Sequence, residues 1–483
     1  MKRACLNINT TKYRPFDASS IRPFKNMNIR MKSIIAITIV LVMAFNVQAQ
    51  DSLKIEWQGQ KKQWALLECI TYAHENNITI KRQTINTQYQ ENLLKQSKLN
   101  RLPDLNASSD GSFSYGYTWV QESATNVDQD LRSFGISANT NLNVFSGLTN
   151  TNTIKRNKVN LLAAFQDMEK TKNDIGLLIT GHYLQILFNK ELLIVANEQY
   201  ETSKLQVDRT KKLVDAGSQA MGSYLEIKSQ AAKEALNVTQ QENDLAISLL
   251  DLAQLLDLER PIEFDIEIPD LPELTAFTPA PPTDIYAVAL DIMPEIKSAT
   301  YNTESKEYDL KIAKGNYYPT LGIGAGMSTN ANWLVGDPYD SNRPLNEQFK
   351  TNKNTYIGAR LSIPIFGRLQ TRNNVANAKL GVMDAQYELK AEKLALRKNI
   401  QQAFADAMAA YNKYLSSEEA VESFTESFRY TEKKFNVGLV NSVDYNVAKT
   451  DFIRAQSNLL QAKYEYILRT KILDFYKGIP LEL

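Results

Sequence analysis

Residues 133–144 read SFGISANTNLNV, and nearly every second side chain in this stretch is apolar. In an extended strand successive side chains point to opposite faces. Phe134, Ile136 and Leu142 would therefore share one face, and the serine, glycine and asparagine residues between them would share the other. The pattern predicts a β-strand with one apolar and one polar face.

Three more stretches alternate in the same way, at residues 112–119, 321–328 and 356–365. Four strands of about ten residues, apolar on one side and polar or glycine on the other, are typical of transmembrane β-strands. A single hairpin of this kind is more often a soluble sheet with one face on a core. Four such strands with no other core to cover them favour the membrane.

The alternation sorts individual residues into two predicted environments. The residues expected to face lipid are Tyr115, Trp119, Ile136, Leu142, Ile323, Ile357 and Leu361. Those expected to face the lumen are Ser114, Asn139, Asn141 and Arg360. An arginine facing lipid at mid-bilayer costs about 2–4 kcal/mol, so Arg360 fits the lumen better. Trp119 and Trp333 lie near the far ends of strands, where interfacial aromatic residues belong.

Four strands cannot close a barrel by themselves. An open sheet in hydrocarbon leaves unpaired backbone groups along two edges, each costing several kcal/mol. Two copies give eight strands, the number in the smallest closed barrels. Side chains fill the interior of such a barrel. Three copies give twelve strands and leave room for a channel, so the sequence predicts a homotrimer.

Proline is absent between Pro103 and Pro261 and again between Pro364 and Pro480. Helix interiors exclude proline at roughly 3 kcal/mol, so these gaps predict very long helices, at 149–215 and 368–436. Each would be about 100 Å long at 1.5 Å per residue. Residues 261–283 hold six prolines and read as an extended connector.

The segments on either side of the connector repeat one pattern. Leu102-Pro103 recurs as Tyr318-Pro319, which is an offset of 216, whereas Gly217 and Lys228 recur as Gly438 and Lys449, an offset of 221. Every seventh residue from 179 to 214 is Ile, Ile, Leu, Tyr, Val and Val, and the second offset converts these positions into Ile, Ala, Tyr, Val, Phe and Phe. The sequence thus predicts an internal duplication, with repeats at 50–260 and 284–483 and coiled-coil packing in both.

Residues 1–49 read as a leader with a secretory signal peptide. An apolar run from Ile34 to Phe45 follows Arg30 and Lys32 and precedes a small-residue cleavage site ending at Ala49. A membrane anchor, the alternative, would need about twenty apolar residues. The natural start is expected at Met27 or Met31.

The composition argues against enzymes and nucleic-acid binders. Removing the eight Lys/Arg and one Asp of residues 1–49 from 55 basic and 54 acidic residues leaves 47 against 53, a net charge of −6. Nucleic-acid-binding domains are usually strongly basic. Cys69 is then the one remaining cysteine, and His74 and His182 are more often packing residues than ligands. No phosphate loop, nucleophile triad or metal cluster is present in the sequence, so we expect neither catalysis nor a cofactor.

Two related segments are the most specific in the chain. Leu213–Gly217 is followed by Ser223-Tyr224, and Lys434–Gly438 is followed by Ser442–Tyr445. In their duplicated order, these segments make the chain similar to the TolC-type outer-membrane efflux proteins, the outer membrane factor family. The resemblance covers nearly the whole chain after the leader.

The resemblance implies a mixed α+β fold in which a long α-helical coiled-coil barrel continues into a transmembrane β-barrel with four strands per protomer. Three internally duplicated chains would give twelve strands and a twelve-helix periplasmic tunnel. Such proteins are passive exit channels of tripartite efflux or type I secretion systems in the cell outer membrane. Their partners are a periplasmic adaptor and an inner-membrane pump, and the pump selects the substrate.

The resemblance also makes the helix-tip turns the periplasmic entrance. The residues expected there are Gly217, Ser223, Tyr224, Phe435, Gly438, Asp444 and Tyr445. The glycines equally read as helix C-caps. The family's arginine after the second glycine is Val440 here, so closure is expected to rest on packing of Phe435 against Tyr445. Asp444 has two readings, a modest cation preference or stabilisation of its own helix N-terminus.

Two other classes of protein share parts of these patterns. A periplasmic adaptor or structural coiled-coil protein would have the export signal and the heptads, but it would not need four alternating strands. A secreted enzyme acting on polysaccharide would need paired carboxylates, and the acids of the predicted helices have solvated-face spacing.

Overall fold

The computed structural model describes residues 63–120, 124–128, 130–270, 280–335 and 343–483. The chain divides into two units, 1–59 and 60–483, and the description below concerns the second. The predicted leader and signal peptide, with Met27 and Met31, lie outside the described residues. So do residues 271–279 of the predicted connector.

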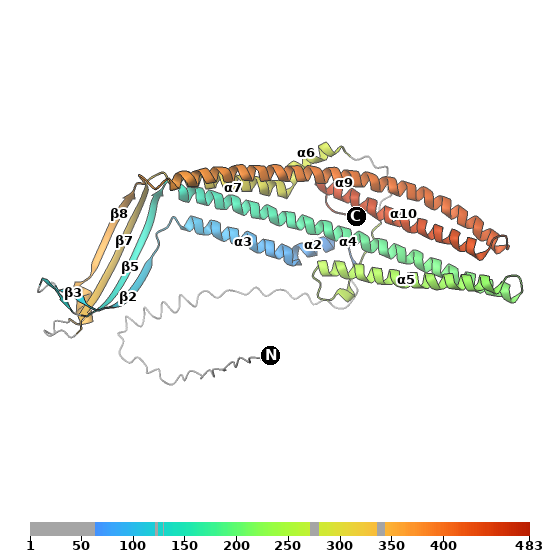
Figure 1. Ribbon diagram of the computed structural model, residues 1–483, viewed down its shortest axis with the longest axis horizontal. Helices are drawn as coiled ribbons and strands as arrows, with labels where there is room; N and C mark the ends of the chain where they lie inside the picture. The colour runs from blue at the N-terminus through green and yellow to red at the C-terminus, as the bar shows by residue number, and fades with distance from the viewer. Residues whose placement is uncertain (1–62, 121–123, 129, 271–279, 336–342) are drawn as a thin grey trace, which may run out of the picture. The chain divides into compact units, whose positions relative to one another are not determined.

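The long helices form two sets of four with matching lengths (Figure 1). The first set is α2 (Leu66–Asn76), α3 (Ile78–Leu99), α4 (Thr149–Asp215) and α5 (Met221–Leu255). The second is α6 (Pro282–Ile292), α7 (Pro294–Gly315), α9 (Gln370–Asn436) and α10 (Ser442–Tyr476). Both sets have 11, 22, 67 and 35 residues in that order. The starts of α2 and α3 recur at an offset of 216 and those of α4 and α5 at an offset of 221, as the sequence pattern predicts.

One antiparallel sheet contains four strands in the order β2-β5-β7-β8. These are β2 (Asn106–Ser114), β5 (Leu131–Ser146), β7 (Thr320–Leu334) and β8 (Asn354–Ser362). A separate hairpin pairs β3 (Tyr117–Val120) with β4 (Thr125–Asp128), and β1 (Gln63–Trp64) pairs in parallel with β6 (Asp265–Ile266). Short helices α8 (Leu345–Thr351) and η2 (Pro261–Glu263) lie between the main elements.

Several predicted strand boundaries are wrong: β2 begins six residues before the predicted residue 112, and β7 ends six residues after the predicted residue 328. The strand expected at 112–119 is divided, because β2 ends at Ser114 and Gly116 adopts a φ of 113°, a conformation that L-residues rarely reach. The chain after Gly116 pairs in the β3–β4 hairpin instead. The strand expected to run to residue 365 ends at Ser362.

A left-handed pair of residues precedes each 67-residue helix. Gly147 and Leu148 have φ of 60° and 63°, and Arg368 and Leu369 have 49° and 59°. These bends re-aim the chain between strand and helix, so α9 begins at Gln370 rather than at the predicted residue 368. The first bend requires glycine for a second reason, because a Cβ on Gly147 would lie 2.1 Å from the carbonyl oxygen of Gly315.

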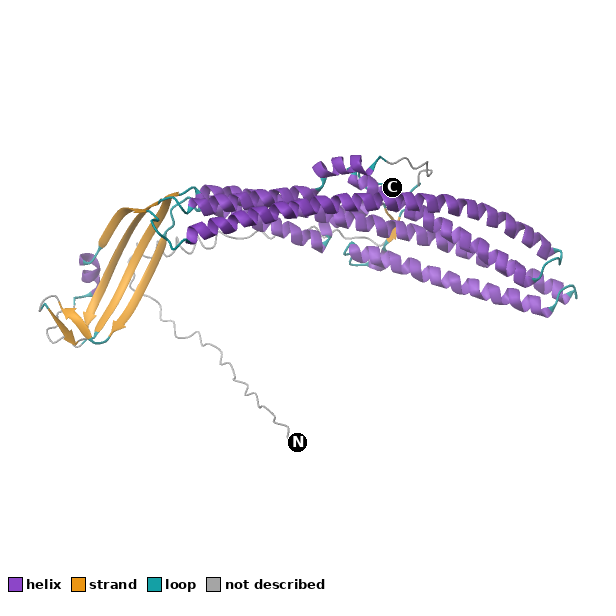
Figure 2. Ribbon diagram, turned by 45° about the horizontal axis from the view of Figure 1, so that its top comes forward, coloured by secondary structure: helices purple, strands orange, loops and turns teal. Residues whose placement is uncertain are grey.

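The helices pack side by side (Figure 2). Helix α4 contacts α3, α5 and α7, while α9 contacts α7 and α10. All twelve residues of the predicted heptad stripe are buried or half-buried. Tyr183, 1% exposed, donates its hydroxyl to the carbonyls of Trp64 at 3.2 Å and Glu267 at 2.7 Å, and so fastens the β1–β6 pair to α4. Along the described residues, no helix combines the length and apolarity that crossing a membrane requires.

Candidate functional site

The strand register places the predicted lipid-facing and lumen-facing residues of the sheet on two different faces. Residues directly opposite in antiparallel strands share a face. Leu142 is opposite Ile323, and Leu321 is opposite Leu361. By this register one face carries Ile136, Leu142, Ile323, Ile357 and Leu361. The other face carries Ser114, Asn139, Asn141 and Arg360.

Two predicted lipid-facing residues lie outside this sheet. Tyr115 follows the end of β2, and Trp119 belongs to β3; both are exposed. A register shift between Asn143 and Phe145 also interrupts the predicted alternation of faces along β5. Because of this bulge Phe145 is opposite Leu321, so it joins the apolar face that strict alternation would deny it.

The apolar face of the sheet is open in a single chain. Ile357 is 81% exposed and Leu361 is 62% exposed, on an edge strand whose nine residues are all exposed. The opposite edge strand, β2, is exposed along all nine of its residues as well. Contiguous exposed apolar surface of this kind marks a lipid or protein contact.

The helix-tip glycines reverse the chain as left-handed caps. Gly217 and Gly438 have φ of 73° and 75°. The N–H of Ser218 donates to the carbonyl of Leu213 at 2.8 Å, and the N–H of Leu439 donates to that of Lys434 at 2.9 Å. These bonds pair carbonyls that the last helical turn would otherwise leave open. The C-cap reading of both glycines is therefore seen directly in the backbone.

Phe435 and Tyr445 pack against each other within one chain. Their ring centroids are 4.7 Å apart, each residue is 2% exposed, and Ile227 of α5 completes the cluster. The cluster joins the tip of α9 and α10 to the neighbouring α5. Closure of an entrance by these rings stays a prediction.

The other predicted tip residues lie around this cluster. Asn441 caps α10, because its side chain accepts the N–H of Asp444 at 2.8 Å. Asp444 is exposed in the first turn of α10, a position where a carboxylate stabilises the helix dipole. Ser223 and Tyr224 are half-buried in the first turn of α5, and the Tyr224 ring lies 5.9 Å from Nζ of Lys228.

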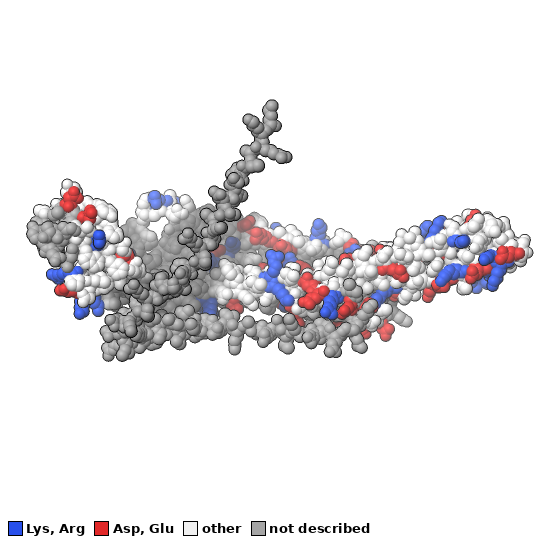
Figure 3. All heavy atoms as spheres, turned by 90° about the horizontal axis from the view of Figure 1, so that it is seen from below, with Lys and Arg blue, Asp and Glu red and all other residues white. Residues whose placement is uncertain are grey.

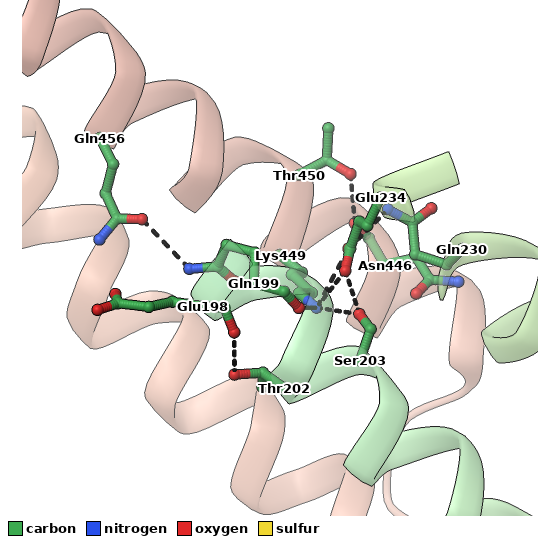
Figure 4. A network of polar contacts seen from close by, with 10 residues as sticks. All are labelled: Glu198, Gln199, Thr202, Ser203, Gln230, Glu234, Asn446, Lys449, Thr450 and Gln456. Carbon is green, nitrogen blue, oxygen red and sulfur yellow. Dashed lines mark hydrogen bonds and ion pairs between the residues drawn. The ribbon is translucent and has the colours of Figure 1, made fainter. Parts of the chain in front are cut away.

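A buried ion pair above the tips is the main feature that sequence reasoning missed (Figure 4). Nζ of Lys449 in α10 lies 3.1 Å from the carboxylate of Glu234 in α5, and the two side chains are 1% and 8% exposed. Lys449 also donates to Oγ of Ser203 and, at 3.3 Å, to the carbonyl of Gln199, both in α4. Burial lowers the pKa of Lys449, and the charge of Glu234 opposes that change. The network ties three helices from both repeats together.

The sequence holds only a weak signal for this pair. Lys449 follows Tyr445 by four residues, so both lie on one helix face. The same spacing in the first repeat, Tyr224 and Lys228, leaves the lysine exposed, so the spacing alone does not predict burial. A second tie lies closer to the tips, where Oγ of Ser442 donates to the carboxylate of Glu226 in α5.

Charge on the described surface is mixed. In the face shown by Figure 3, acidic and basic side chains are interspersed along the helices. Among the described residues, no three His, Cys, Asp or Glu side chains converge on a position for a metal ion. A groove between α4, α7 and α9 collects Asp167, Glu295, Glu388 and Glu392, with Lys170 beside them.

Comparisons with known proteins agree on one family. Residues 285–475 match the family model described as "Outer membrane efflux protein". The chain is 22% identical over 303 residues to the alkaline protease secretion protein AprF of Pseudomonas aeruginosa, covering 62% of this chain and 60% of that protein. It is 24% identical over 372 residues to the cation efflux system protein CusC of Escherichia coli O157:H7, covering 72% of this chain and 73% of that one. The match to AprF thus spans less than two thirds of that relative.

Solved structures share the fold. A structure of CusC aligns with a TM-score of 0.70 at 14% identity, over 88% of this chain and 96% of that one. The outer membrane protein VceC of Vibrio cholerae also aligns with a TM-score of 0.70, at 17% identity, over 86% of this chain and 97% of that one. Residues 285–475 thus match the outer membrane efflux protein family model, and most of the chain shares the fold of CusC and VceC.

Proposed function

We propose that three copies of this chain form the outer-membrane exit channel of a tripartite efflux or type I secretion system. The sheets of the three chains close a twelve-strand barrel in the membrane, and the helices line a periplasmic tunnel. A periplasmic adaptor and an inner-membrane pump deliver the substrate, which crosses the channel passively.

The observation that carries this proposal is the open four-stranded sheet. Its edge strands, β2 and β8, each have nine residues, and in the described part of the chain each pairs on one side only. In hydrocarbon every unpaired backbone group costs several kcal/mol, so two open edges together cost tens of kcal/mol. Neighbouring copies that pair β2 with β8 remove both edges at once.

The choice of three copies follows from the size of the lumen. Eight strands leave an interior that side chains fill, whereas twelve leave a passage. The face expected to line it carries mostly small or polar residues, including Ser114 of β2 and Asn139 and Asn141 of β5. The two asparagines lie opposite Gly326 and Gly324 of β7. Such a lining discriminates little between substrates, which fits selection by the pump.

Purified protein is expected to insert into planar lipid bilayers and to give discrete conductance steps. In cells it should fractionate with the outer membrane. A protein that stays in the periplasmic fraction and gives no conductance would contradict the proposal and favour a periplasmic adaptor instead.

Exchanging Asp444 for asparagine tests whether the entrance selects ions. Three Asp444 carboxylates around the axis would attract cations, so the D444N channel should show a lower cation-over-anion preference. Reversal potentials in a salt gradient measure this preference. An unchanged reversal potential would leave Asp444 with its helix-dipole role alone.

A further inference from the structure

The interface between α4 and α7 within one chain has a regular pairing of residues. Asp167 accepts from Ser298 at 2.5 Å, Asn160 and Ser305 are 2.6 Å apart at their side-chain oxygens, and Arg156 binds Asp309 at 3.1 Å. The residue numbers of each pair add to 465. A constant sum means that the two helices run antiparallel with one fixed alignment along the interface.

The duplication carries this alignment to helices that do not meet within one chain. The offset of 221 converts α4 into α9, and the offset of 216 converts α7 into α3. Asp167 and Ser298 become Glu388 and Arg82, and Asn160 and Ser305 become Gly381 and Tyr89. Arg156 and Asp309 become Asn377 and Leu93.

Two of the three transferred pairs are complementary although their residue types have changed. Arg82 and Glu388 have opposite charges, both are exposed, and neither makes an ion pair with another described residue. Tyr89 is a large side chain that is 58% exposed, and a Cβ on Gly381 would meet nothing within 4 Å. One turn before Tyr89, Ile85 is 64% exposed, whereas Ala385, at the matching height of α9, is buried and accepts a hydrogen bond from Thr303 of α7. Leu93 opposite Asn377 is neither favourable nor repulsive.

We propose that α3 of one subunit docks on α9 of the next, with Arg82 paired to Glu388 and Tyr89 seated over Gly381. The inference rests on the proposed assembly and adds its register. The docking partner is a second copy of this chain. Among the described helices, α3 is the repeat equivalent of α7, and α3 does not pack against α9 within one chain. Within the chain α3 packs against α4, and α9 packs against α7 and α10. The α4–α7 interface within each subunit and the α9–α3 interface between subunits would then share one helix alignment around the trimer.

Cysteine cross-linking tests the register directly. Ser305 and Asn160 touch through short side chains, so the equivalent Y89C and G381C should come within disulfide reach, a Cα separation of about 4.4–6.8 Å. Under mild oxidation the double variant is expected to run as a covalent trimer without reductant. Cys69 can stay, because its thiol is fully buried and burial raises its pKa to about 12.

The matched control moves one cysteine around the helix. Met383 is half exposed and lies two residues from Gly381, about 200° around α9, so Y89C with M383C should not cross-link. Covalent trimers from Y89C/M383C instead of Y89C/G381C would overturn the register. A native trimer that neither pair cross-links would overturn it too, while leaving the proposed channel intact. A monomeric, non-conducting protein would instead sink the proposed function.

A charge exchange tests the ion pair without cysteines. R82E places two carboxylates together and E388R places two guanidinium groups together, so each should shift the trimer–monomer balance in detergent toward monomer by about three- to tenfold. The double variant R82E/E388R restores opposite charges and should recover most of the loss. Additive losses in the double variant would show that the two side chains do not meet.

Discussion

Replacing Glu234 with glutamine is expected to loosen the helix tips more than any other single polar substitution in α5. The change leaves Lys449 buried without a counter-charge while the shape of the site is kept. Removing one partner of a buried ion pair costs about 3–5 kcal/mol. The loss should fall on the ends of α4, α5 and α10, the three helices that the network joins.

Hydrogen exchange of these helix ends measures the effect. Local unfolding of these helix ends, and so the exchange rate of their amide protons, should rise at least about a hundredfold, since each 1.4 kcal/mol is a factor of ten. An exposed pair supplies the control: Lys413 and Glu465 are 2.8 Å apart but 45% and 36% exposed, so K413A should cost less than about 1 kcal/mol.

A double variant separates charge burial from packing. E234L with K449M removes both charges and keeps apolar volume, so protection should return toward that of the parent. Equal exchange in E234Q and K413A would show that the buried pair does not hold the two hairpins together.

Introducing arginine at Ile357 is expected to block membrane assembly. Ile357 lies on the apolar sheet face and is 81% exposed in a single chain. An arginine on a lipid-facing strand position costs about 2–4 kcal/mol at mid-bilayer, and three copies triple that cost. The yield of assembled protein in lipid vesicles should fall steeply.

Gly358 offers the matched control on the opposite face of the same strand. A Cβ there would meet nothing within 4 Å, so arginine has room, and the face already carries Arg360. G358R should therefore assemble nearly as well as the parent. If I357R assembles normally and G358R does not, the two faces have been assigned the wrong way round.

The sequence predicts the helical part of this fold well because its signals are local and repeated. The proline-free stretches and heptads predict α4 at its observed bounds and α9 to within two residues. The two-residue error at α9 comes from Arg368 and Leu369, which adopt a left-handed conformation that neither residue type announces. Gly147 gives that signal in the first repeat only.

The ends of the strands are harder to predict, because the alternation of apolar and polar residues continues across a break between two strands. Residues 112–119 alternate without interruption, yet Gly116 divides them between the main sheet and the β3–β4 hairpin. A glycine in a strand pattern is compatible with either outcome. The bulge that turns Phe145 to the apolar face is likewise set by pairing with β7, which a single strand cannot reveal.

In the candidate site, too, features set by local sequence are predictable and features set by packing between distant segments are not. The tip glycines follow from a local helix-ending pattern and adopt the predicted conformation. Lys449 and Glu234 are 215 residues apart in the chain, and their contact depends on how α10 packs against α4 and α5. Local patterns therefore locate the tips but leave open what fastens them.

The number of chains in the assembly tests the central claim most directly. Native mass spectrometry of protein extracted from the outer membrane in mild detergent should give the mass of three chains. One sheet alone leaves the outer side of both edge strands unpaired, and twelve strands are needed to leave a passage. A mass of one chain in material that is folded and membrane-inserted would contradict this account.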